Sequence, residues 1–516
     1  MESHRFRKAL SFTFLVLLLL SCAHRATPQA QEVILHVDGQ DFVVQAAGPT
    51  VRQVLEQAGV TLGSLDRVTP DLWAAVEPDM RIEIIRVREE RQTRVLAYPR
   101  QVVKDEGVAV GEQRLLQLGA NGTEELLYQI SYDGTVVLGS ELIASRVITP
   151  PRPEILMVGV APPTVTVSFS GTLAYIANGN AWVMRGSSAS RTPLTFSGDL
   201  DGRVFALSPD GNYLLYSRRL PQGHHSGAFN ELFVIDTQFT VQGEQSLGLR
   251  NILYASWSPD GERIAYSTAE PADGAPGWIA HNDLQVMRPD GSMNHVILPP
   301  SSQGLYSWWG TRFFWSPEGS QFAYANGNEV GLIDAKWGTR VILTRFPPYH
   351  TYSEWVWTPT LAWSPDGRYL LAVVHGGEGS TVPEESPDFD LWLFDIEGGG
   401  RYLLARGVGM WCVPAWSPIP GGRGHRSIAY TAAVHTESSD SSPYALYLVG
   451  RDGTGAGRVF PRQNEPGTVG QGLAWGPDGR TLAFLWNGDI VLWDMHAEPQ
   501  ILTASGACTA LVWGGP

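Results

Sequence analysis

Aromatic and histidine side chains gather in a series of insertions in the second half of the chain, and these residues are the best candidates for binding a ligand. Tryptophan and tyrosine present flat apolar surface at low entropic cost, which suits stacking on sugar rings or gripping a peptide. Alternatively, several of them pack between loops and simply cover one end of the domain. The residues predicted to bind a ligand are His224, His225, Trp278, His281, Trp308, Trp309, Tyr352, Trp355 and His375.

A metal site is the other chemistry that these histidines offer. His224 and His225, together with acids such as Asp283 or Asp390, are ligand types that zinc accepts. They show neither the helical His-x-x-x-His pattern nor another defined ligand spacing. We therefore expect no metal and no other cofactor.

A Ser-Pro-Asp-Gly turn recurs along the chain, and its acidic residue resembles one half of a catalytic carboxylate pair. Each copy falls in a separate repeat, so we expect the carboxylates to lie far apart. Proline presets φ for a β-turn, and glycine accepts the positive φ that follows. The turn is therefore predicted to be structural. Its copies start at Ser208, Ser258, Ser316, Ser364, the degenerate Ser417 and the variant Gly476.

The elements around these turns form a repeat with a spacing of 48 to 59 residues. Each unit contains four short apolar strands, and four antiparallel strands make one blade of a β-propeller. A tryptophan precedes five of the turns, and we expect its large ring to fill the space between neighbouring blades.

The two ends of this repeat region complete one another. The final segment CTALVWGGP has the pattern of a first strand, whereas GTLAYIANGNAWVMRG has the pattern of the later strands of a blade. Their pairing would close a ring of seven blades over residues 165–516 and remove open sheet edges. The repeats resemble the WD40-like (PD40) or TolB-like propeller family, a resemblance that implies a fold more strongly than a function.

The long insertions lie between the second and third strands of a unit or between units. In a four-stranded blade these connections emerge on one face, opposite the Ser-Pro-Asp-Gly turns. Loops on a rigid scaffold commonly carry function, so this face is the predicted binding face.

Residues 32–88 predict a small ubiquitin-like (β-grasp) domain. Asp38-Gly39 separates two alternating apolar runs, which is a hairpin signal. Thr50 and Gln53 predict a capping box at the start of a helix that ends at Gly59. The stretch resembles the small domain of unknown function that precedes G5 domains in bacterial cell-wall proteins.

Residues 89–160 carry a spaced set of glycines in turn-like contexts. The segment resembles a G5 domain, a thin β-module of extracellular bacterial proteins. This resemblance implies binding to cell-wall sugars such as N-acetylglucosamine. The glycines that match are Gly111, Gly119, Gly122, Gly134 and Gly159.

The N-terminus predicts export. Basic residues precede an apolar run from Ala9 to Leu20, which is too short to span a bilayer comfortably. The segment Leu19-Leu20-Ser21-Cys22 resembles a bacterial lipoprotein signal, which implies a signal peptide at 1–21, lipidation of Cys22 and a tether at 22–31. A plain secretory signal is the alternative. Both place the protein outside the cytoplasm, at the cell surface or in a periplasm.

Composition narrows the class of partner. The formal net charge is −15 and charged residues make up 17% of the chain, a balance that argues against nucleic-acid binding, which needs clustered Lys and Arg. Cys412 and Cys508 fall in different repeats and are expected to be buried free thiols, with a disulfide in an exported protein as the alternative.

Together these patterns predict a mainly β protein: a seven-bladed β-propeller preceded by a small β-grasp-like domain and a G5 β-module. We expect it to be a membrane-anchored binding protein for peptidoglycan, another glycan or an envelope protein. No Gly-x-Ser-x-Gly nucleophile motif occurs, and we expect no enzymatic activity. The alternatives are a propeller-type polysaccharide hydrolase or lyase, and a TolB-like component of an envelope assembly.

Overall fold

The computed structural model describes residues 31–105, 108–160, 166–220, 227–238, 243–377, 380–419, 427–461, 467–468 and 472–515. Contacts divide them into two compact units, the first with 31–98 and 120–152 and the second with 99–119 and 153 onward. The predicted signal and tether, including Cys22, and the pair His224 and His225 lie outside the described residues. Within the described part of the chain, no helix has the length and apolar character needed to span a membrane.

The first unit begins with a ubiquitin-like arrangement of strands around one helix. The helix buries Val51, Val54 and Leu55 against the first and fourth strands. Asp38 takes a positive φ of 53° in the predicted hairpin turn. The elements are β1 (Gln31–Val37), β2 (Gln40–Ala46), α1 (Val51–Gln57), β3 (Arg67–Thr69) and β4 (Arg81–Leu96).

The predicted capping box is wrong, although Thr50 does stand at the N-cap of α1. Its side chain makes no capping hydrogen bond. Instead, the amides of Val51 and Arg52 donate to the carbonyl oxygens of Ala74 and Leu72, at 3.1 and 2.9 Å. A distant loop therefore satisfies the first helical amides, which a local sequence pattern does not reveal.

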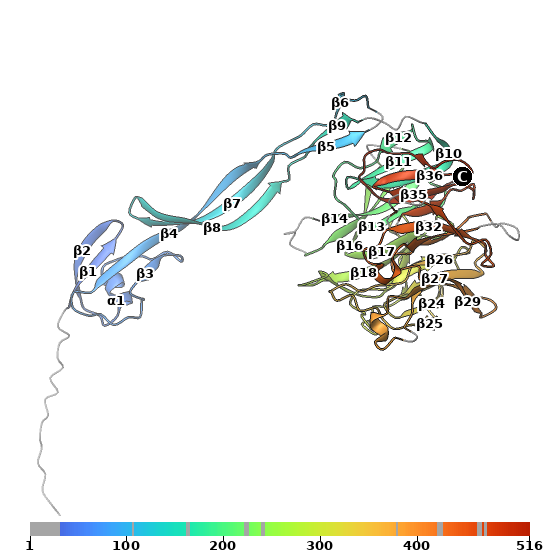
Figure 1. Ribbon diagram of the computed structural model, residues 1–516. Coiled ribbons are helices and arrows are strands. Elements are labelled where there is room, and N and C mark those ends of the chain that lie inside the picture. The colour runs from blue at the N-terminus through green and yellow to red at the C-terminus, as the bar shows by residue number, and fades with distance from the viewer. Residues whose placement is uncertain are drawn as a thin grey trace, which may run out of the picture. The chain divides into compact units, whose positions relative to one another are not determined.

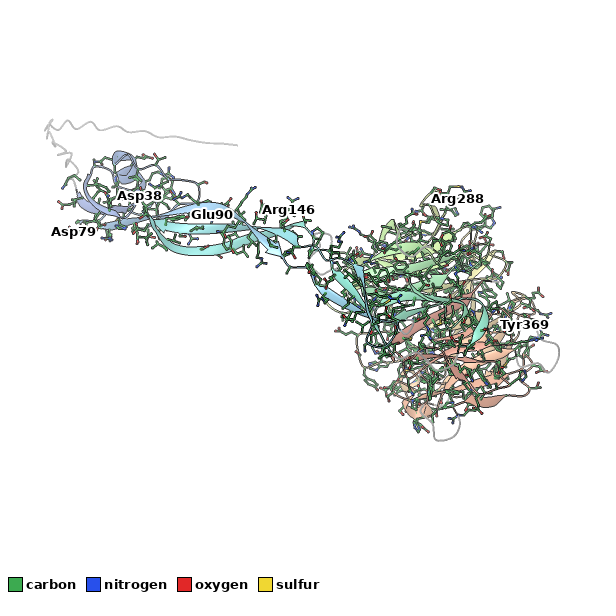
Figure 2. The ribbon with its side chains drawn as sticks, turned by 90° about the horizontal axis from the view of Figure 1, so that it is seen from above. Asp38, Asp79, Glu90, Arg146, Arg288 and Tyr369 are labelled. Atoms are coloured by element: carbon green, nitrogen blue, oxygen red, sulfur yellow. The ribbon has the colours of Figure 1, made fainter. Side chains whose placement is uncertain are left out.

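Strand β4 continues beyond this core into an antiparallel ribbon with β7 (Gly122–Asp133) and β8 (Val136–Thr149). Every residue of β8 is exposed, so the ribbon is one sheet thick. Figure 2 shows its side chains standing out on both sides, with Arg146 of β8 labelled.

The second unit starts with a small sheet made of β5 (Arg100–Asp105), β6 (Gln113–Gln117) and β9 (Glu154–Gly159), in the order β5-β9-β6. Val103 and Met157 of this sheet share a buried cluster with Tyr175, Trp182 and Leu502 of the propeller. The strands of the segment 89–160 are thus divided between two units, with this half packed on the propeller.

The rest of the second unit is a seven-bladed β-propeller, as predicted (Figure 1). Each blade is an antiparallel sheet, and β38 (Cys508–Gly514) pairs with β10 to complete the first one. The other strands, blade by blade, are β10 (Ser168–Ala177), β11 (Asn180–Ser187), β12 (Arg191–Pro193); β13 (Leu200–Leu207), β14 (Tyr213–Arg219), β15 (Asn230–Asp236), β16 (Gln245–Arg250); β17 (Ile252–Trp257), β18 (Ile264–Pro271), β19 (Trp278–Ala280), β20 (Leu284–Met287), β21 (His295–Leu298); β22 (Arg312–Trp315), β23 (Gln321–Ala325), β24 (Glu329–Asp334), β25 (Arg340–Arg345); β26 (Leu361–Trp363), β27 (Tyr369–His375), β28 (Phe389–Asp395), β29 (Arg401–Ala405); β30 (Pro414–Trp416), β31 (Ile428–Ala433), β32 (Tyr444–Val449), β33 (Gly457–Phe460); and β34 (Leu473–Trp475), β35 (Leu482–Trp486), β36 (Asp489–Trp493), β37 (Gln500–Ile501). Short 3-10 helices η1 (Pro383–Glu385) and η2 (Thr436–Ser438) lie in connections.

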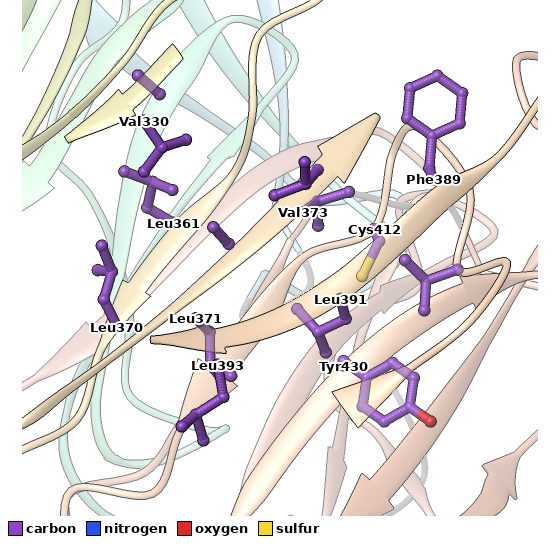
Figure 3. Close-up of a cluster of buried hydrophobic side chains, with 14 of the residues drawn as sticks. Val330, Leu361, Leu370, Leu371, Val373, Phe389, Leu391, Leu393, Cys412 and Tyr430 are labelled. Carbon is purple, nitrogen blue, oxygen red and sulfur yellow. The ribbon is translucent and has the colours of Figure 1, made fainter. Parts of the chain in front are cut away.

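Apolar side chains fill the spaces between successive blades. Figure 3 shows one such cluster, in which Leu370 and Leu391 of the fifth blade meet Val330 of the fourth and Tyr430 of the sixth. Cys412 is fully buried in this cluster as a free thiol, as predicted, and burial raises its pKa.

The tryptophans that precede the turns also join blades by hydrogen bonds. In four cases the indole Nε1 donates to a carbonyl in the first strand of the preceding blade. The pairs are Trp257 to Ala206 (3.1 Å), Trp363 to Phe314 (3.1 Å), Trp416 to Ala362 (3.2 Å) and Trp475 to Ala415 (3.1 Å).

The Ser-Pro-Asp-Gly turn is held by its own side chains. Ser258 Oγ donates to Asp260 Oδ1, and the amides of Glu262 and Arg263 donate to Asp260 Oδ1 and Ser258 Oγ at 3.0 and 2.9 Å. Burial raises the pKa of Asp260, but these hydrogen bonds and the charge of Arg263 lower it overall. The carboxylate is therefore an acceptor that closes the turn.

We predict that Trp475→Phe destabilises the propeller by about 1–2 kcal/mol, because it removes an inter-blade hydrogen bond and part of a buried ring. Chemical denaturation measures the free energy of unfolding. Trp337→Phe is the matched control, because Trp337 is 73% exposed. Equal stabilities of the two variants would contradict the inter-blade role.

We predict that Asp260→Ala lowers stability by about 1 kcal/mol at neutral pH and leaves ligand binding unchanged. A carboxyl with a lowered pKa stabilises the fold above its ordinary pKa, and this contribution disappears as the pH falls through the folded-state value. The difference from wild type should therefore shrink below about pH 4. Thermal unfolding across a pH series measures it, with the exposed Asp273→Ala as control.

Candidate functional site

A cavity of about 810 Å³ lies in the propeller channel, and residues of the predicted binding face form part of its lining. Because the strands of each blade are antiparallel, the first strands begin at the face that carries the long insertions and end at the Ser-Pro-Asp-Gly turns. The cavity is lined by the first strands β13, β17 and β22, which lie next to one another, and by Trp278 and Trp309 from the insertions.

Trp278 and Trp309 form one aromatic group at this cavity. Their ring centroids lie 5.3 Å apart, and Trp278 Nε1 donates to the Trp309 carbonyl at 3.2 Å. Trp308 meets Trp309 edge-on at 5.7 Å. Each of the three rings is half-buried and keeps some surface for a ligand. The structure thus brings together three of the predicted residues.

A buried asparagine holds the loop that carries these rings. Asn282 Nδ2 donates to the carbonyls of Ser301 and Ser307 at 3.0 and 2.8 Å, and Asn282 Oδ1 accepts from Thr311 at 2.8 Å. Gly310 has a φ of +113°, and a Cβ there would lie 3.1 Å from Leu253 Cδ1. The aromatic group is therefore preformed.

Two arginines, Arg203 on β13 and Arg312 on β22, line the cavity beneath the aromatic group. The Cζ atom of Arg203 lies 4.4 Å from the centroid of Trp278, a cation–π contact. Water in the channel reaches both side chains, although protein surrounds them. Desolvation lowers the pKa of both groups, and repulsion from Arg203 lowers that of Arg312 further.

The remaining predicted residues lie outside the cavity. His281 Nδ1 is 2.7 Å from Thr268 Oγ1. Tyr352 is 70% exposed and stacks on His350, whereas Trp355 stacks on Trp411.

His375 is fully buried and is among the residues that line a second cavity, of about 460 Å³, instead of the channel cavity. Its exposed fraction is 1%. Both ring nitrogens lie 2.8 Å from carbonyl oxygens, those of Pro347 and Ser386. Tyr349 and Phe389 pack against the ring at centroid distances of 5.3 and 4.9 Å. The side chain tethers two connections of the fifth blade to its second strand.

The described residues contain no cluster of three or more His, Cys, Asp or Glu side chains that could hold a metal ion. His224 and His225, the pair considered for such a site, are not among them.

Sequence reasoning missed Arg203 and Arg312. Arg203 precedes the turn serine of its blade by five residues, where the third blade has Leu253. Arg312 precedes its serine by four residues, where other blades have residues such as Val413 and Gly472. An arginine at a position that is uncharged in the other blades, at or next to a first strand, was the available signal, because first strands line the channel.

The chain contains two domains that match known family models. Residues 87–161 match the G5 domain, and residues 33–72 match the G5-linked ubiquitin-like domain. These matches support a binding role and an extracellular or cell-wall location, and they identify no ligand.

Other similarities are more distant. Resuscitation-promoting factor RpfB of Mycolicibacterium smegmatis is 30% identical over 164 residues, which make up 31% of this chain. The chain spans 43% of the length of that relative. TolB from Acinetobacter baumannii is 14% identical with a TM-score of 0.37, over 78% of this chain and 82% of that one. A TolB-like structure from Agrobacterium tumefaciens is 16% identical with a TM-score of 0.35, over 61% and 96%.

Proposed function

We propose that this chain is an exported, membrane-anchored binding protein of the cell envelope, and that its propeller recognises a glycan at the channel cavity without transforming it. The observation that carries the proposal is the preformed aromatic group of Trp278, Trp308 and Trp309. Asn282 holds its loop, and Trp278 and Trp309 line the cavity. A rigid site of this kind binds without the entropic cost of ordering its own loops.

A sugar ring fits this site better than a purely apolar ligand does. Sugar rings present flat C–H faces that pack on aromatic rings, and hydroxyl edges that need polar partners. The cavity lining also includes Ser256 and Thr358, which carry hydroxyl groups. A peptide ligand is the alternative occupant, and the binding experiment below includes it.

The proposal of binding without chemistry is supported by the charges in the cavity. Polysaccharide hydrolysis commonly uses two carboxylates on opposite sides of the bond to be cleaved. Among the described residues that line the cavity, Asp201 is the one carboxylate. Its oxygens already accept from Ser217 Oγ, from Asn230 Nδ2 at 2.9 Å and from the Arg203 amide at 3.0 Å.

The N-terminal part extends the proposal to the cell wall and the membrane. We propose that the G5 domain contacts peptidoglycan, in line with the match at residues 87–161. We also propose that a lipid on Cys22 anchors the chain to the membrane, since several acyl chains together give stable anchoring.

We predict that Trp309→Ala weakens glycan binding by the full chain about tenfold or more, because it removes a central aromatic anchor. Isothermal titration calorimetry against a panel of soluble peptidoglycan fragments, neutral oligosaccharides, acidic oligosaccharides and matched peptides measures it. The exposed Trp337→Ala should leave binding unchanged. Binding to peptides alone, or turnover of any bound glycan, would contradict the proposal.

We predict that Cys22→Ser moves the protein from the membrane fraction to the soluble exported fraction of its host. Loss of the thiol removes the only lipidation position that the motif offers. Labelling with a radioactive fatty acid, followed by fractionation, measures the change. Equal membrane association and equal labelling of both forms would show that Cys22 is not the anchor.

A further inference from the structure

Arg203 and Arg312 have no ion-pair partner in the described part of the chain. No described side chain accepts a hydrogen bond from Arg312. Two like charges share one channel, where partial desolvation strengthens their repulsion. Both residues are exposed to the channel, so their guanidinium groups are open to an anion that enters the cavity.

Asp201 offsets part of this charge: desolvation lowers the pKa of Arg203, and the negative charge of Asp201 raises it in part. Its carboxylate already accepts hydrogen bonds from Ser217, Asn230 and the backbone amide of Arg203. With two arginines and one aspartate, the charged lining of the cavity sums to +1. The whole chain has a formal net charge of −15, so this cavity is basic within an acidic protein.

We propose that the cavity binds the negatively charged group of an acidic glycan, a carboxylate or a phosphate, between Arg203 and Arg312. The inference rests on the glycan binding proposed above and names the class of sugar. The planar guanidinium matches either anion with two parallel N–H donors. An anion seated there supplies the missing countercharge.

Several features favour an acidic glycan over an acidic protein. The anion site and the tryptophans line one cavity of about 810 Å³, within the size range of small-ligand pockets rather than of protein interfaces. Arg203 is held against Trp278 by the cation–π contact. The charged group and an adjoining sugar ring therefore meet preformed partners in the same pocket.

Ligand affinity and melting temperature together distinguish an arginine that binds a ligand from one that stabilises the fold. A residue kept for binding weakens ligand affinity when it is replaced, but its removal also relieves repulsion in the free protein. We therefore expect Arg312→Gln to leave the melting temperature of the unliganded protein unchanged or higher. An arginine that holds the fold together would behave in the opposite way.

The test uses the full chain and four probes of similar length: a polyuronate oligosaccharide, a phosphate-bearing teichoic-acid-type oligomer, a neutral N-acetylglucosamine oligosaccharide and a poly-glutamate peptide. Calorimetry is performed on wild type, Arg312→Gln, Arg312→Lys and the control Arg288→Gln. Arg288 is an exposed arginine of the third blade that does not line the cavity (Figure 2).

We predict that wild type binds at least one acidic glycan more tightly than the neutral one, with an affinity that falls as salt rises. Arg312→Gln should weaken acidic-glycan binding about tenfold or more, the effect of losing a charge-assisted hydrogen bond. Arg312→Lys should retain part of the affinity, and Arg288→Gln all of it. The carboxylate and phosphate probes show which anion the site prefers.

Three results of the binding measurements would overturn the inference: equal binding of acidic and neutral glycans, unchanged affinity in Arg312→Gln, or equal binding of the poly-glutamate peptide. A clear fall in the melting temperature of unliganded Arg312→Gln would assign the residue to the fold and also overturn it. Tight Trp309-dependent binding of the neutral glycan would leave the proposed function intact while this inference fails. If no glycan binds, both fail together.

Discussion

The propeller depends on one repeated interaction, the indole hydrogen bond from a turn-adjacent tryptophan to the first strand of the preceding blade. Each bond fixes one blade against the next near the axis, where first strands of neighbouring blades meet. The series is incomplete. Trp513 Nε1 donates instead to Ser170 within its own blade, the buried Nε1 of Trp315 has no hydrogen-bond partner, and Leu207 replaces the tryptophan of the second blade. At that point, pairing of β38 with β10 supplies the closure.

Stability and binding draw on the same first strands, because Trp257 and Trp363 of the inter-blade bonds also line the channel cavity. The turns and the inter-blade bonds lie at one end of the first strands, while the aromatic loop and the two arginines lie toward the other. A ring stabilised by apolar clusters between its blades can tolerate local electrostatic strain, such as two unpaired cations in its channel. Sites that are locally unfavourable commonly persist where the surrounding fold over-determines them.

The sequence allowed the blades, their turns and the split closing blade to be predicted, because these features repeat and each copy reinforces the others. It did not reveal what satisfies the first amides of α1, since Leu72 and Ala74 contribute carbonyls from a separate loop. Among the predicted ligand residues, His375 is engaged by Pro347 and Ser386. The residue type of His375 suggested a ligand-binding role, but the sequence does not show its contacts with the two carbonyl groups.

Repetition also explains why the sequence pattern did not indicate the two arginines. A repeat is recognised from the positions that carry the same residue type in every blade. A single binding site in a symmetric ring must instead use residues that differ from those at the matching positions of the other blades. Arg203 and Arg312 are such residues, on two different first strands that only the closed ring brings to one cavity.

The boundaries of a domain found by sequence similarity also differ from those of the compact units in the structure. Residues 87–161 match one family model, yet Val103 and Met157 are buried with propeller residues. Removing all of residues 87–161 would expose part of the propeller core. A deletion that leaves the propeller undisturbed must therefore be shorter than the segment that the family model matches.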